Sequence, residues 1–126
     1  MKILIIEDSA LYRKIHAKLL NKVLPDAELI AAGDGWEGYQ LFEKEEPDYI
    51  LLDLLMPVMS GVDFLRLLRD KYPATKSKVV VLSADVQRVV KEEVMALGVL
   101  EFIHKPFTED KALYLSEVIR RSRDVE

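Results

Sequence analysis

Acidic, hydroxyl and amino side chains follow four short aliphatic runs of the sequence, each at the point where the run ends. Continuous aliphatic runs of this length are typical of strands that are buried on both faces, and hence of a parallel sheet. The carboxyl ends of parallel strands lie along one edge of the sheet, where ligands bind. We therefore expect the residues that follow the four runs to converge on one site: Glu7 and Asp8 after Lys2–Ile6, Asp53 after Tyr49–Leu52, Ser83 after Val79–Leu82, and Lys105 after Glu101–His104.

The chemistry of this group points to a cation and an anion bound side by side. Adjacent carboxylates repel each other unless a cation lies between them, and hard oxygen ligands favour Mg²⁺, which also binds phosphate. Taken singly, the residues other than Asp53 have ordinary alternatives: solvated loop charges for Glu7 and Asp8, a strand-end cap for Ser83 and a surface amine for Lys105. Asp53 is harder to explain in this way, because it directly follows an apolar strand. The peptide bond between Lys105 and Pro106 is a candidate for the cis form. The convergence of all these residues on one edge favours a site.

The segments between the runs have the periodicity of helices. Residues Leu11, Ile15, Leu19 and Val23 recur at every fourth position, with Ser9 as an N-cap. A strand is expected over residues 27–31, followed by a helix from the capping box at Asp34 to about Glu45. The next two helices are expected to bury Val62, Leu65 and Leu68, and then Val86, Val89 or Val90, Val94 and Leu97, with the second ending before Gly98. The last helix is expected to be capped by Thr108 and to bury Ala112, Leu115 and Ile119.

Five strands that alternate with five helices predict a doubly wound α/β fold, because right-handed crossovers place helices on both faces of a parallel sheet. The polar segment 120–126 is expected to fray. Two histidines are assigned no chemistry: His16 is predicted to be solvated on a polar helix face, and His104 to point to the opposite face of its strand from Lys105.

Length and composition limit the classes of function. A chain of 126 residues, half of them hydrophobic, predicts a single domain over 1–126. The net charge of -4 argues against a nucleic-acid surface, and the lack of cysteine rules out disulfides and thiolate metal sites. No apolar stretch approaches the roughly 18 residues that cross a bilayer, and the first strand begins too early for a signal peptide. A cytoplasmic protein without membrane contact is expected.

The chain resembles the receiver domain of bacterial response regulators, especially single-domain ones like the chemotaxis regulator. The resemblance covers nearly the whole chain and rests on motifs in the same order and spacing: Glu7-Asp8, Asp53 in Asp-Leu-Leu-Met-Pro, Gly61, Ser83-Ala84, and Lys105-Pro106-Phe107. It implies the flavodoxin-like fold, with a five-stranded parallel sheet in the order 2-1-3-4-5 and five helices.

The resemblance implies a phosphoacceptor module rather than an enzyme, with self-catalysed phosphotransfer and slow autodephosphorylation. Asp53 is then the acceptor, and the donor is a sensor histidine kinase, a phosphotransfer protein or a small molecule such as acetyl phosphate. Magnesium is held by Glu7, Asp8, Asp53 and the backbone carbonyl of Leu55, with Glu7 reaching it through water. Lys105 and Ser83 bind the phosphoryl oxygens.

A switch is implied by the same resemblance. The phosphoryl group draws the Ser83 hydroxyl toward it, and Phe102 moves into the vacated space. The surface of the fourth helix, fifth strand and fifth helix then controls a downstream target protein, and a homodimer through that surface is a further option. Leu55 is apolar where many relatives carry a polar side chain that positions the hydrolytic water, so slow loss of the phosphoryl group is expected.

Other functions remain as alternatives. The chain is also compatible with an N-terminal receiver fragment of a larger response regulator, or with a receiver-like scaffold that is never phosphorylated. A flavin-binding electron carrier shares the fold, but Glu7 and Asp8 would repel its phosphate. A haloacid-type phosphatase needs a second Asp two residues after the nucleophile, where this chain has Leu55.

Overall fold

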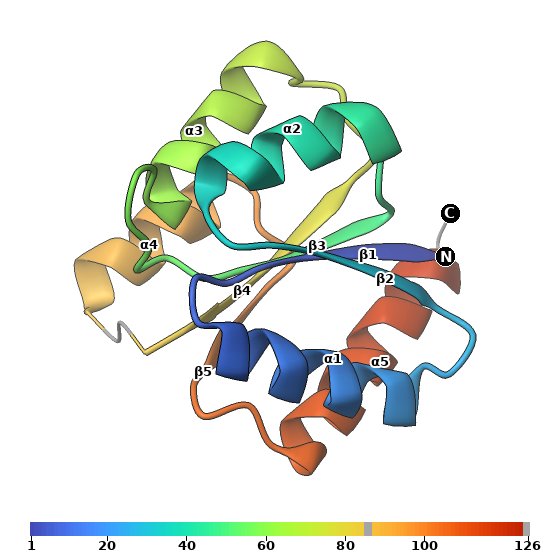
Figure 1. Ribbon diagram of the computed structural model, residues 1–126. Coiled ribbons are helices and arrows are strands. Elements are labelled where there is room, and N and C mark those ends of the chain that lie inside the picture. Colours follow the sequence, from blue (N-terminus) through green and yellow to red (C-terminus); the bar gives the residue numbers. More distant parts are fainter. Residues whose placement is uncertain (85–86, 125–126) are drawn as a thin grey trace.

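The computed structural model describes residues 1–84 and 87–124, and within these ranges the chain forms one parallel sheet with helices on both faces (Figure 1). The strands are β1 (Lys2–Ile6), β2 (Glu28–Ala32), β3 (Tyr49–Leu52), β4 (Lys78–Ser83) and β5 (Glu101–His104). Their order across the sheet is β2-β1-β3-β4-β5, and every pair is parallel. The predicted flavodoxin-like fold is therefore confirmed.

The helices divide into two layers (Figure 1). Helices α1 (Ala10–Val23) and α5 (Glu109–Asp124) cover one face of the sheet, and α2 (Gly35–Glu45), α3 (Gly61–Lys71) and α4 (Arg88–Ala96) cover the other. Each face has its own hydrophobic core, because alternate residues of the central strands point into opposite layers. Along β3, for example, Ile50 and Leu52 join the α2–α4 core while Tyr49 and Leu51 join the α1–α5 core.

Side-chain caps fix where four of the helices begin. Ser9, Asp34 and Ser60 each accept a hydrogen bond from the backbone N–H three residues on, which satisfies a donor that the first helical turn leaves unpaired. Thr108 plays the same part for α5 by accepting from the N–H of Lys111 at 3.3 Å. All four helices, α1, α2, α3 and α5, begin at the edge of the sheet where the strands end, so their caps also hold the loops of that edge.

Backbone hydrogen bonds between neighbouring strands continue for one residue beyond the sheet and fix the register of the strand ends. The N–H of Glu7 donates to Ala32 at 3.1 Å, that of Asp53 to Ile6 at 3.0 Å, and that of Lys105 to Ser83 at 3.0 Å. Each functional candidate therefore leaves the sheet beside the end of a neighbouring strand. This register is what brings their side chains to one edge.

The first helix is found where it was predicted, but its buried face differs from the row of every fourth residue. Leu11 and Ile15 are 65% and 38% exposed, whereas His16 and Leu20 are buried. A row of every fourth residue winds around an α-helix, since a turn takes 3.6 residues. The prediction that His16 is solvated is wrong: its side chain is 3% exposed and packs against the ring of Phe107.

The last helix also departs from expectation. Fraying was predicted over 120–126, yet α5 continues to Asp124, and residues 125–126 lie outside the described range. Ser122 is buried and shares a hydrogen bond with the Tyr49 hydroxyl of β3, so this polar segment is attached to the sheet.

In α4 the inner position is Val90 rather than Val89, which is 74% exposed. The predicted Val86 lies outside the described residues, and β2 begins one residue later than expected.

Gly61 allows the loop after β3 to fold tightly against Asp53. A Cβ atom at position 61 would lie 2.2 Å from the carbonyl oxygen of Asp53 and 2.7 Å from the Cα of Leu54. Both are backbone atoms that cannot rotate away. The N–H of Gly61 also donates to the Leu54 carbonyl at 3.0 Å, so the start of α3 is attached to the residues that carry the acidic site.

Replacing Gly61 by alanine is expected to lower the free energy of unfolding by about 1–3 kcal/mol, the usual cost of overpacking, as measured by urea denaturation. Gly33→Ala is the matched control. A Cβ at position 33 would meet only the ends of two flexible side chains, Arg13 at 3.3 Å and Glu37 at 3.6 Å. Equal stability of the two variants would contradict this assignment of Gly61.

Candidate functional site

Two buried carboxylates and one ammonium form the centre of the candidate site. Glu7 follows β1 and Asp53 follows the adjacent strand β3, and their side chains are only 2% and 5% exposed. The Nζ of Lys105, from the end of β5, lies 2.5 Å from Oε1 of Glu7 and 3.3 Å from Oδ2 of Asp53. A buried carboxylate is costly unless it is paired, and Lys105 supplies the opposite charge to both.

Backbone donors and an arginine fix the geometry of the two acidic loops. The second oxygen of Glu7 accepts from the Ser9 N–H at 3.1 Å, and the second oxygen of Asp53 accepts from the Leu55 N–H at 3.4 Å. The guanidinium of Arg13 donates to the carbonyls of Glu7 and Asp8 at 2.7 and 3.1 Å. The loop after β1 is thus anchored by its own helix.

Electrostatic crowding is visible in the pKa values of the site. A hydrogen bond with Glu7, partial burial and the negative charge of Glu7 together raise the pKa of Asp8 above its usual value. For Lys105, burial opposes the charge, but hydrogen bonds and the charges of Glu7 and Asp53 outweigh it, so the pKa of the amine is raised. The carboxylates of the site therefore carry more negative charge than Lys105 alone neutralises.

This surplus of hard oxygen ligands fits a divalent cation. One carboxylate oxygen from each of Glu7, Asp8 and Asp53 can be chosen so that all three lie within 4.8 Å of one another. Asp8 is exposed to solvent while the other two are buried, which leaves an open side for water ligands. Magnesium takes a few carboxylates and keeps several waters, so the donor set is chemically suited to it.

The remaining predicted residues surround this centre. Ser83 is fully buried at the end of β4, and Lys105 donates its N–H to the Ser83 carbonyl. Phe102 of β5 is 8% exposed and packs in the α2–α4 core, with Nζ of Lys91 at 5.7 Å from its ring centroid. His104 is exposed and stacks edge-on against Phe102 rather than entering the acidic centre. The Lys105–Pro106 peptide bond is cis.

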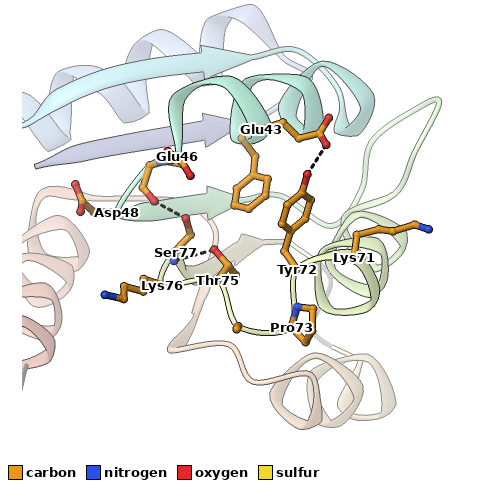
Figure 2. Close-up of a pocket in the computed structure, with 12 residues that line it drawn as sticks. Glu43, Glu46, Asp48, Lys71, Tyr72, Pro73, Thr75, Lys76 and Ser77 are labelled. Carbon is orange, nitrogen blue, oxygen red and sulfur yellow. Dashed lines mark hydrogen bonds between the residues drawn. The ribbon is translucent and has the colours of Figure 1, made fainter.

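A larger hollow, of about 640 Å³, lies at the opposite edge of the sheet, near the start of β3 and β4 (Figure 2). Its polar groups are largely paired with one another: the Tyr72 hydroxyl donates to Glu43 at 2.5 Å, the Ser77 N–H donates to the Thr75 hydroxyl, and the Ser77 hydroxyl donates to the Pro47 carbonyl. Ligands of open α/β sheets bind at the carboxyl ends of the strands. Size alone therefore does not make this hollow the functional site.

Residues 3–115 match the family model described as the response regulator receiver domain. The chain belongs to this family. Phosphoryl acceptance is the general function of receiver domains, which act in two-component systems. The flavin-carrier and phosphatase alternatives are not supported by this match.

Relatives of known structure share the fold of this receiver and about a quarter of its sequence. The response regulator domain of Thermotoga maritima CheB is 26% identical, with a TM-score of 0.84 over 100% of this chain and 98% of that one. The Vibrio cholerae chemotaxis protein CheY4 is 28% identical, with a TM-score of 0.79 over 95% of this chain and 96% of that one.

A relative known by sequence is the protein-glutamate methylesterase/protein-glutamine glutaminase of Pyrococcus abyssi, which is 36% identical over 111 residues. The match covers 84% of this chain but 28% of that protein. The receiver thus spans less than a third of the length of this methylesterase relative. In the part of the chain that the structure describes, no helix is long and apolar enough to cross a membrane.

Three residues beside the site were given no role from the sequence: Tyr12 and Arg13, which were not considered, and His16, which was expected to be solvated. All three lie on the first two turns of α1. The ring of Tyr12 stacks on that of His16 with 6.1 Å between centroids and an interplanar angle of 18°. Their spacing of four residues is the signal that could have found this pair, because side chains at i and i+4 are neighbours on a helix. Burial lowers the pKa of His16 to about 4, helped by the positive charge of Lys105.

Acid sensitivity is expected to come partly from His16. Its unfolded form binds a proton near pH 6.5, while the folded form stays neutral until about pH 4. Stability from the neutral ring is thus fully present above pH 6.5 and is lost as the pH falls toward 4. At the upper limit the loss is about 3 kcal/mol. Urea denaturation of wild type and His16→Leu over this range should show wild type losing stability relative to the variant.

The exposed His104 supplies the control for this measurement. His104→Leu removes a histidine without removing a buried ring. It should leave the pH dependence of wild type nearly unchanged. If His16→Leu and His104→Leu behave alike, His16 does not cause the acid sensitivity.

Proposed function

We propose that this receiver accepts a phosphoryl group on Asp53 from a phosphohistidine of a sensor kinase or phosphotransfer protein in the cytoplasm. The observation that carries the proposal is the Asp53 carboxylate, which is buried at a strand end, paired with Lys105 and grouped with two further carboxylates. A buried aspartate serving only stability would need its partner but not the additional acids around it.

In the proposed reaction, a carboxylate oxygen of Asp53 attacks the phosphorus atom. A P–O bond forms as the bond from phosphorus to the donor imidazole nitrogen breaks, and the leaving nitrogen takes the electron pair. Phosphoryl transfer needs little covalent chemistry from the protein, so positioning and charge stabilisation dominate. Lys105 turns part of its contact from Asp53 to a phosphoryl oxygen, and the Ser83 hydroxyl and the Leu55 N–H serve the other oxygens.

A magnesium ion would be held by Glu7, Asp8, Asp53 and the carbonyl of Leu55, and it would neutralise charge on the phosphoryl oxygens. The two oxygens of Glu7 already accept from Lys105 and the Ser9 N–H, which supports a contact through water from this residue. Asp8 is the solvent-facing ligand of the set. Its raised pKa reflects crowding that a cation would relieve.

The output of the switch is assigned to the surface of α4, β5 and α5. Ser83 and Phe102 connect this surface to the site, since Ser83 ends β4 and Phe102 lies on the adjacent strand, paired with Val81. A phosphoryl group that attracts the Ser83 hydroxyl would change the space beside Phe102. The surface would then control a downstream protein, a second copy of this chain, or another domain of a longer regulator, as the short coverage of the methylesterase relative permits.

Phosphorylation at Asp53 is tested by intact-mass measurement after incubation with acetyl phosphate and Mg²⁺. Wild type should gain the mass of one phosphoryl group, and Asp53→Ala should gain none because the nucleophile is missing. Asp70→Ala removes an exposed aspartate of α3 and should be modified as wild type is. Unchanged modification of Asp53→Ala would place the acceptor elsewhere.

A long-lived phosphoryl group is expected from Leu55, whose side chain is 58% exposed beside the acceptor and offers no hydrogen bond to a hydrolytic water. Leu55→Asn supplies such a group and should shorten the lifetime of phosphorylated Asp53 by roughly tenfold, in line with the contribution of one transition-state contact. The lifetime is followed by mass after removal of the donor. Leu55→Ala is the control, and equal lifetimes for the two variants would contradict the role of the side chain.

A further inference from the structure

We propose that Tyr12 is a positioning residue for Lys105: its aromatic face, backed by His16 and Phe107, restricts where the lysine ammonium can move when a phosphoryl group arrives. The inference rests on the proposed function of Asp53 and Lys105. It concerns a residue of α1 that none of the sequence motifs includes, and it follows from three ring contacts at one side of the site.

The contact between Tyr12 and Lys105 is of the cation–π type. The Nζ of Lys105 lies 5.3 Å from the centroid of the Tyr12 ring, within the range of about 6 Å for attraction between a cation and an aromatic face. The same Nζ is bound to Glu7 and Asp53. The ammonium is therefore held by two carboxylates, from the ends of β1 and β3, and by a ring of α1.

Two further rings hold Tyr12 in place. His16 stacks on Tyr12 nearly in parallel, and its other contact is edge-on to Phe107, with 5.5 Å between centroids and an angle of 89°. His16 and Phe107 are 3% and 6% exposed, so both lie in the packed interior, whereas Tyr12 is 48% exposed. Buried side chains occupy fixed rotamers in a close-packed core. A partly exposed ring is thus supported from beneath by buried ones.

The arrangement closes on itself through the chain. Phe107 is only two residues after Lys105, and the two are separated by Pro106. The segment that carries Lys105 therefore also carries Phe107. The ring of Phe107 packs against His16, which in turn stacks on Tyr12. Any shift of this segment relative to α1 therefore moves Lys105 together with Phe107, which supports the rings that hold Tyr12, so that the ammonium stays close to the Tyr12 ring.

The ring matters most when Lys105 changes partners. In the proposed reaction the ammonium gives up part of its contact with Asp53 as that carboxylate becomes the acceptor. A lysine has four side-chain torsions and a large rotamer entropy. The partly exposed Tyr12 ring attracts the ammonium only weakly. It therefore limits the conformations that the Lys105 side chain can adopt without holding the ammonium in its contact with Asp53.

The experiment compares Tyr12→Phe and Tyr12→Leu with wild type. Phenylalanine keeps the aromatic face and removes only the hydroxyl, so it should preserve the rate constant of Asp53 phosphorylation by acetyl phosphate and Mg²⁺. Leucine keeps apolar bulk but has no quadrupole, and it should lower the rate constant two- to fivefold, the range expected for a solvent-accessible cation–π contact. Equal rates for Tyr12→Leu and wild type would overturn the proposal.

A spectroscopic readout separates positioning from a general loss of structure. In wild type and Tyr12→Phe, the ring current should shift the Lys105 side-chain NMR resonances, and in Tyr12→Leu that shift should disappear while distant resonances are retained. Tyr72→Leu makes the same change at the far edge of the sheet and should preserve both the rate and the Lys105 resonances. If wild type itself is not phosphorylated at Asp53, the proposed function fails; if wild type reacts but Tyr12→Leu reacts equally fast, only the role of Tyr12 fails.

Discussion

The ammonium of Lys105 between two buried carboxylates is the interaction on which the site depends. Each carboxylate would lose several kcal/mol on leaving water without a partner, and each is held at its strand end by backbone bonds that leave little freedom to move away. Lys105 comes from the edge strand β5, while Asp53 and Glu7 follow β3 and β1. Its side chain must therefore cross the end of β4. That strand ends in Ser83, a small and fully buried residue, which leaves room for the crossing.

The sequence was sufficient to predict the sheet and the convergence of its strand ends. Aliphatic runs such as Tyr49–Leu52 can be read locally, because a strand buried on both faces has no polar face to alternate. Once the runs are parallel strands, the positions of Asp53 and Lys105 at one edge follow from topology. The order of the strands needed the family resemblance, since periodicity alone does not determine which strands are neighbours.

The errors concern residues whose environment is set by distant partners. His16 lies between Ile15 and Ala17 in a helix rich in lysine, and nothing local distinguishes it from an exposed polar residue. Its burial is decided by Phe107, which is far along the chain. Ser122 is similar: the segment around it is charged, but the Tyr49 hydroxyl binds it and so extends α5. Such contacts depend on how layers pack, and packing is not visible in the period of one helix.

The end of β5 links the acidic centre to both layers of the molecule. Two aromatic residues flank Lys105 in sequence, and they pack on opposite faces of the sheet: Phe102 in the core beneath α4, and Phe107 in the core with α1 and α5. The segment around Lys105 is therefore anchored by one aromatic ring in each core. On one side, Phe107 packs against His16 of α1 and holds the segment of Lys105 in place. On the other side, Phe102 contacts the exposed side chains of Lys91 and His104, near the surface of α4. Because close-packed cores resist gradual deformation, the proposed switch would displace residues on the side of Phe102 and α4 rather than on the side packed against α1.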